Sequence, residues 1–101
     1  MGFFTSPEKS LYSAMIDASR SEDAGTPVKI SEVEYGELRA ATMNLVRRSG
    51  SSGGEVKRSF ISGARFVMAG RGSDSPVRAL VDCLFDADSY PEFRRLAGGG
   101  F

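Results

Sequence analysis

The chain is predicted to form a mostly α-helical single domain, a small bundle of four to five short helices with room for one short strand or hairpin. Two observations predict this class. Serine residues stand directly before segments in which apolar residues recur at helical spacing, and glycine-rich stretches separate these segments. A length of 101 residues fits one domain with one modest core.

The whole chain, residues 1–101, is expected to belong to this domain. Two stretches rich in glycine and serine, near 49–54 and 70–74, are expected to be flexible connectors. A third glycine-rich stretch, residues 98–101, is expected to form a tail.

The first helix is expected over residues 6–20. Ser6 can accept hydrogen bonds from the first free amides, and Pro7 presets the first helical dihedral angle. Apolar residues follow at helical spacing from Leu11 onwards. The helix is expected to fade in the polar segment that ends at Gly25.

The second helix, over residues 31–48, has the clearest start signal. Ser31 and Glu34 have the spacing of a capping box, in which each side chain binds the backbone amide of the other. Two arginines suit the negative C-terminal end of this helix, and Gly50 can adopt the left-handed conformation that closes it.

The second helix has two apolar faces. One consists of Tyr35, Leu38, Thr42 and Leu45, and the other of Val33, Gly36, Ala40 and Met43. A helix that is apolar over so much of its circumference is usually packed on two sides, which favours a central helix of the core. The alternative is that the second face, with its small residues, is an oligomer interface.

The segment 55–69 fits either a helix or a hairpin that turns at Ser62-Gly63. A helix is favoured because the segment is longer than a usual strand. Ser75-Pro76 opens another helix, expected over 75–87, which has the most regular apolar stripe in the chain. A final short helix, over 91–97, is expected to direct Phe93 and Leu96 inward. The predicted core consists of Leu11, Met15, Leu38, Leu45, Phe60, Val67, Leu80, Val81, Leu84 and Phe85.

The residues that carry most enzyme chemistry are missing. The chain has no histidine and one cysteine, Cys83, so it has no imidazole base and can form no internal disulfide. Cys83 lies beside the apolar stripe of its helix and is expected to be a small buried hydrophobic residue. The nearby Asp82 and Asp86 lack the loop pattern of a calcium site. The sequence therefore predicts a protein that is not an enzyme and has no cofactor and no metal site.

Composition and segment lengths indicate the cellular setting. Basic and acidic residues balance at 13 each, so no overall charge attracts nucleic acid or an anionic membrane. The N-terminus lacks a secretory signal, and no apolar run approaches the ~18 residues of a membrane span. We expect a soluble, cytoplasmic or otherwise intracellular protein, or one within a virion or another assembly.

The region from Lys29 to Arg78 has nine basic and five acidic residues, a local excess of four positive charges. Within it, the extended segment 28–30, the capped helix, a glycine- and serine-rich turn and a second helix resemble the ribbon-helix-helix family of DNA-binding proteins. This resemblance implies a homodimer whose paired strands enter the major groove. The DNA contacts that it implies are Lys29 for the groove and Ser51, Ser52 and Arg58 for phosphates.

The leading functional prediction is a non-catalytic interaction protein, a small accessory or structural subunit of a larger complex such as a phage or viral one. Its expected partners are other protein subunits, in a homo- or hetero-oligomer. Aromatic residues at both ends of the chain and the small-residue face of the second helix favour this function over catalysis. The candidate interface residues are Phe3, Phe4, Gly36, Ala40, Met43 and Phe101.

Overall fold

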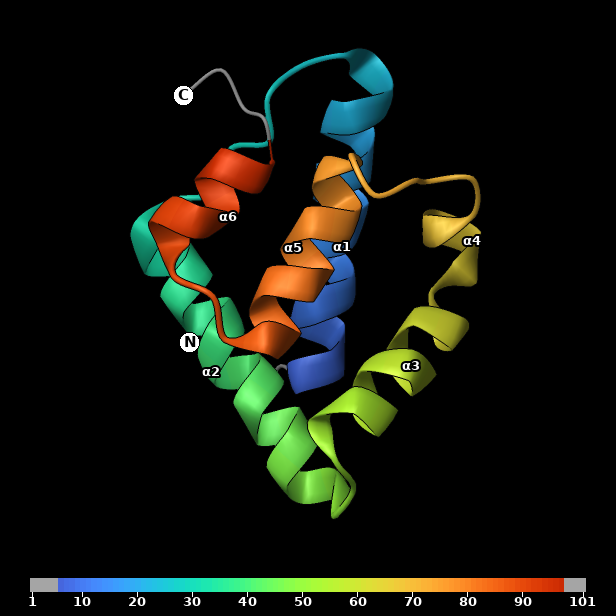
Figure 1. Cartoon of the computed structure of the whole chain (residues 1–101), viewed down its shortest axis with the longest axis vertical. Coiled ribbons are helices and arrows are strands. Elements are labelled where there is room, and N and C mark those ends of the chain that lie inside the picture. The colour runs from blue at the N-terminus through green and yellow to red at the C-terminus, as the bar shows by residue number, and fades with distance from the viewer. Residues whose placement is uncertain (1–5, 98–101) are drawn as a thin grey trace.

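The computed structural model describes residues 6–97, and these residues form six helices and no strand. In chain order the helices are α1 (Pro7–Ala24), α2 (Glu32–Ser49), α3 (Gly53–Gly63), α4 (Arg65–Met68), α5 (Pro76–Asp86) and α6 (Tyr90–Leu96) (Figure 1). The predicted class, a small and mostly helical bundle, is confirmed. The structure has one helix more than expected because the segment 55–69 forms two helices, and the hairpin alternative for that segment is wrong.

Serine residues begin five of the six helices. Each side-chain oxygen accepts a hydrogen bond from the backbone amide three residues later, at 3.1–3.3 Å, in Ser6, Ser31, Ser52, Ser75 and Ser89. The complete capping box lies at Ser52 and Glu55, whereas at Ser31 the serine half of the predicted box is observed. Because the serine at Ser52 caps α3 two residues earlier than expected, the connector after α2 is shorter than predicted.

Helix α1 runs four residues beyond its predicted end at residue 20 and closes at Gly25, which adopts the left-handed conformation. The sequence favoured fading because these residues are polar. In the structure, Arg71 binds both acidic residues of this last turn, Glu22 at 2.9 Å and Asp23 at 3.2 Å. These tertiary contacts add to the local closure by Gly25, whose amide donates to the Glu22 carbonyl at 3.1 Å.

The break between α3 and α4 follows Gly63, which lies close to Tyr12 on α1. A side chain on Gly63 would place its Cβ 2.8 Å from the hydroxyl oxygen of Tyr12 on α1, so Tyr12 would have to shift to accommodate it. Directly after it, Ala64 leaves helical geometry with φ −104° and ψ 18°. The single helix predicted over 55–69 is therefore wrong at this point.

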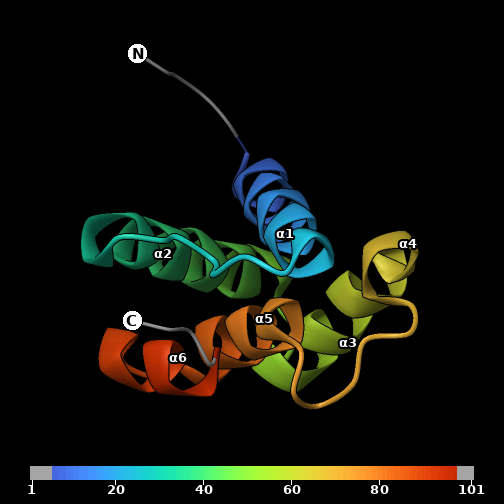
Figure 2. The ribbon, with the colours of Figure 1, turned by 90° about the horizontal axis from the view of Figure 1, so that it is seen from above.

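Helix α5 is the centre of the bundle. It packs against α1, α2, α3 and α6, and α1 and α2 also pack against each other. Seen from above, α1 and α2 form one layer and α3, α5 and α6 lie beneath them (Figure 2). The apolar stripe of α5 and its other inward side chains, Val77, Leu80, Val81, Cys83 and Leu84, are almost fully buried between these layers.

Most of the predicted core is confirmed. Leu11, Met15, Leu38, Phe60, Val67, Leu80, Val81 and Leu84 are buried. Leu45 and Phe85 are only partly buried and pack at the edge of the core. Phe93 is fully buried as expected, but the prediction for Leu96 is wrong, since its side chain is 42% exposed and Ala97 is buried instead. The cause is that α6 is short and directs one residue, Phe93, into the bundle.

Candidate protein interface on helix α2

One face of α2 is anchored in the core. Tyr35, Leu38 and Thr42 are buried, and the Thr42 hydroxyl donates to the Leu38 carbonyl within the helix at 2.8 Å. The ring of Tyr35 stacks on Phe93 with a centroid distance of 5.2 Å. This confirms that the first predicted face packs inward, with Leu45 at its margin.

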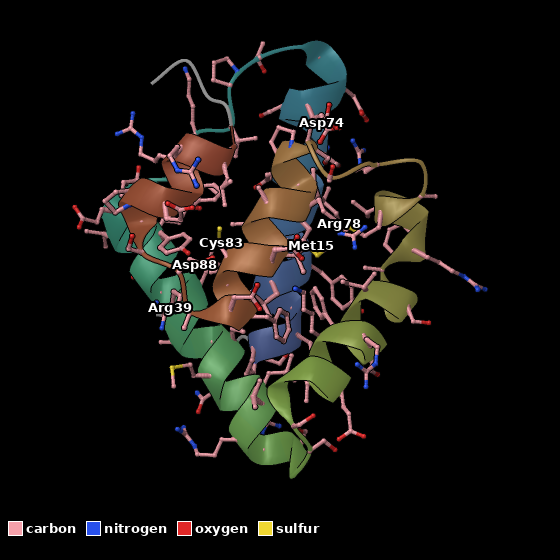
Figure 3. The ribbon with its side chains drawn as sticks, viewed as in Figure 1. Met15, Arg39, Asp74, Arg78, Cys83 and Asp88 are labelled. Carbon is pink, nitrogen blue, oxygen red and sulfur yellow. The ribbon has the colours of Figure 1, made fainter. Side chains whose placement is uncertain are left out.

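Tyr35 also fixes the rotation of α2 about its own axis. Its hydroxyl donates to the backbone carbonyl of Asp88 at 2.7 Å, and Arg39 approaches the same carbonyl at 3.4 Å (Figure 3). Burial, together with the nearby Cys83, raises the pKa of Tyr35 to about 12, so the phenol is a neutral donor at physiological pH. These contacts join α2 to the segment between α5 and α6 and determine which face points outward.

The second face of α2 is exposed. Val33 is 75% and Met43 56% exposed, and Gly36 and Ala40 between them are exposed as well. With 100° per residue, these positions lie opposite the buried face. The interpretation of α2 as a central helix packed on both sides is therefore wrong, and the structure brings together three of the six predicted interface residues. We call Val33, Gly36, Ala40 and Met43 the α2 stripe.

No contact within residues 6–97 requires glycine at position 36. Gly36 lies inside the helix, and a Cβ added to it would have nothing within 4 Å. Glycine in a helix interior destabilises by about 0.5–1 kcal/mol relative to alanine. At Gly63, by contrast, an added Cβ would lie 2.8 Å from the hydroxyl oxygen of Tyr12. The fold of residues 6–97 therefore gives no reason for glycine at position 36.

An apolar hollow adjoins the stripe at Met43. It has a volume of about 320 Å³ and extends from the C-terminal half of α2 to the end of α5. Val46, Leu84 and Phe85 line it together with Met43. The edge position of Phe85 is thus part of a continuous apolar surface beside the stripe. The sequence did not reveal this hollow, because it depends on the packing of α5 against α2.

Charge is divided between the two ends of α2. Its residues 32–37 include three glutamates and no base, and residues 38–49 include three arginines and no acid. None of the ion pairs within residues 6–97 includes Glu32, Glu37 or Arg47. Arg47 instead binds the side-chain oxygen of Asn44 on its own helix.

The residues of the DNA-binding alternative lie at opposite ends of α2. Lys29 is exposed before the helix begins, and Ser51, Ser52 and Arg58 are exposed after it ends. Eighteen helical residues separate the two groups by about 27 Å. At the start of α3 the Glu55 side chain accepts from both the amide and the hydroxyl of Ser52, so a carboxylate occupies the position where a phosphate would bind. The structure does not bring these four residues together.

Phe3, Phe4 and Phe101 were also predicted as interface residues. They lie outside the described residues 6–97, as does the predicted tail 98–101.

The acidic side chains and the cysteine of α5 are accounted for by contacts within the fold. Lys57 on α3 lies 2.8 Å from Asp82 and 3.7 Å from Asp86, the two acidic side chains of α5. Cys83 is fully buried, and burial, aided by Asp88, raises the pKa of its thiol to about 12. Within residues 6–97, no three histidine, cysteine or acidic side chains gather in a way that could hold a metal ion.

No family model, no curated protein and no solved structure matches the chain. Among the helices of residues 6–97, none combines the length and the apolar character needed to cross a bilayer.

Proposed function

We propose that the protein is a non-catalytic subunit that binds another protein through the α2 stripe. The observation that supports this most strongly is the exposure of Val33 and Met43 on either side of Gly36, a helix residue where an added side chain would meet no other atom. Large exposed apolar side chains next to a close-approach position are typical of helix-packing surfaces. The anchored Tyr35 on the opposite side keeps this surface in place without a partner.

A DNA-binding function as a ribbon-helix-helix dimer has less support. Such a dimer requires residues 28–30 to pair as a strand with a second copy. In this fold Val28 and Ile30 are buried and Lys29 is exposed, the alternation that the resemblance implies. The Ile30 carbonyl, however, already accepts a hydrogen bond of 2.6 Å from the Tyr90 hydroxyl. Pairing would have to break this contact, so we place protein binding ahead of DNA binding.

The experiment compares the wild type with Ala40→Arg, which puts a charged side chain into the middle of the α2 stripe. Ser13→Arg, on the exposed side of α1, is the matched control. Size-exclusion chromatography with light scattering measures the mass of each purified protein, and of the complexes formed in cell extract. We expect wild type and Ser13→Arg to form a defined complex and Ala40→Arg to remain monomeric with unchanged circular dichroism. Complexes that are unaffected by Ala40→Arg would overturn the proposal.

A further inference from the structure

We propose that the partner bound by the α2 stripe is a second copy of this chain, whose α2 crosses the first in the antiparallel direction. This inference rests on the proposed function and specifies its partner. Three features support it. The two ends of α2 carry opposite charges, the small residues Gly36 and Ala40 lie in the middle of the stripe, and the stripe can pair with a second, antiparallel copy of itself.

The charges favour an antiparallel partner of the same sequence. Two antiparallel copies place the acidic end of each α2 beside the basic end of the other, and at 100° per residue Glu32 and Arg47 are the charges that lie on the side of the stripe. Parallel copies would place like charges together. One basic residue, Lys29, lies close to the acidic end of α2, but it precedes the first residue of the helix. Opposite charges across an interface fix orientation and register more than they add affinity.

The stripe is also self-complementary in this orientation. When the two helices cross between Gly36 and Ala40, the Gly36 position of one copy faces the Ala40 position of the other, and Val33 faces Met43. Each contact then occurs twice, as in an isologous two-fold interface. The two small residues permit close approach, and the two large exposed residues pack on either side of the crossing.

The size of the surface predicts a weak dimer. The stripe covers about 16 Å of helix, a short length compared with the ~800 Å² that each partner of a stable complex usually buries. The apolar hollow beside Met43 extends the surface towards Phe85 and can receive a side chain of the second copy. We therefore expect an equilibrium between monomer and dimer that depends on protein concentration.

Charge exchange tests the antiparallel arrangement. Analytical ultracentrifugation of the whole chain at low salt gives the dissociation constant of the dimer. Arg47→Glu and Glu32→Arg should each weaken it about tenfold, because each places like charges together twice in the two-fold dimer. The double variant restores opposite charges and should return the constant to near the wild-type value. Two weakened single variants without recovery in the double variant would overturn the antiparallel arrangement.

Gly36→Ala should have opposite effects on the stability of the monomer and on the strength of the dimer. The substitution should raise the melting temperature of the monomer, since nothing obstructs the added methyl group, and weaken the dimer. A dimer as strong as that of the wild type would contradict close approach at Gly36.

Two outcomes distinguish a wrong partner from a wrong binding surface. A wild-type chain that is monomeric at every concentration, but enters a complex with another protein that Ala40→Arg abolishes, would overturn the second copy as partner and leave the proposed function in place. A dimer that Ala40→Arg does not weaken would overturn both.

Discussion

The carboxylate of Glu22, in the last turn of α1, accepts a hydrogen bond of 2.6 Å from the hydroxyl of Ser75, the residue that caps α5. The same hydroxyl oxygen accepts from the backbone amide of Arg78 at 3.2 Å. Glu22 thus orients the cap of a helix 53 residues further along the chain. The Arg71 guanidinium, 2.9 Å from the other carboxylate oxygen, completes the contact.

Glu22→Gln should destabilise the fold and reduce its sensitivity to acid. Burial alone would raise the pKa of Glu22, but hydrogen bonds from Ser75 and the Val77 amide, together with Arg71, outweigh it and lower the pKa below 4.5. A lowered pKa stabilises the fold above the unfolded value, and this stabilisation is lost as the pH falls through the folded value. We expect a loss of about 1–3 kcal/mol at pH 7.

Urea unfolding between pH 7 and pH 3 measures this effect. The wild type should lose stability below about pH 4.5, and the difference from Glu22→Gln should shrink in the same range. Asp74→Asn, an exposed acid in the same loop as Ser75, is the control and should differ little from the wild type. A difference between Glu22→Gln and the wild type that stays constant to pH 3 would contradict the lowered pKa.

Leu84→Ala and Leu96→Ala are a matched pair that tests the core. Leu84 is buried in α5 and its loss should cost about 2–5 kcal/mol, because a cavity remains. Leu96 is 42% exposed, and its loss should cost about 0.5 kcal/mol. Chemical denaturation gives both values. Equal losses would mean that α6 directs Leu96 inward, as the sequence had suggested.

Local signals account for the parts of the fold that could be predicted. A serine before a helix and an apolar stripe act within a few residues, so the starts of α1, α2 and α5 and the stripe of α5 were predictable. Gly25 closes α1 locally, but the ion pairs of its last turn with Arg71 and the contact of Gly63 with Tyr12 join residues that are distant in sequence. No local pattern contains those tertiary contacts.

The same distinction holds for the candidate site. Helical spacing was sufficient to identify Gly36, Ala40 and Met43 as one face of a helix. Whether another helix covers that face depends on how the Tyr35 hydroxyl binds the Asp88 carbonyl and so orients α2. The hollow beside Met43 likewise arises from the position of α5. A sequence pattern can therefore define the face but not its exposure.

Gly63→Ala should destabilise the fold, in contrast to Gly36→Ala. The new Cβ would lie 2.8 Å from the hydroxyl oxygen of Tyr12, whose ring is held by stacking on Phe60 at 4.7 Å. Overpacking of this kind costs about 1–3 kcal/mol, against a helix-propensity gain of at most about 1 kcal/mol. Tyr12→Phe removes the obstructing oxygen, so the double variant should recover most of the loss. Thermal unfolding checks this, and an equal loss in the double variant would contradict the steric cause.

The thiol of Cys83 should be unreactive in the folded protein and should make the fold sensitive to alkali. Burial, aided by Asp88, raises its pKa from 9.0 to about 12. A raised pKa means that the neutral thiol stabilises the fold below the unfolded value, and that this stabilisation is lost as the pH rises from 9 towards 12.

Thiol labelling at pH 8 tests this prediction directly, because the thiolate is the reactive form. Native protein should react at least about a hundredfold more slowly than protein unfolded in guanidinium, since the thiol is inaccessible as well as protonated. Cys83→Ala should be unfolded by alkali at a higher pH than expected from its stability at pH 7. Rapid labelling of the native protein would show that Cys83 is accessible and would contradict its place in the core between α5 and its neighbours.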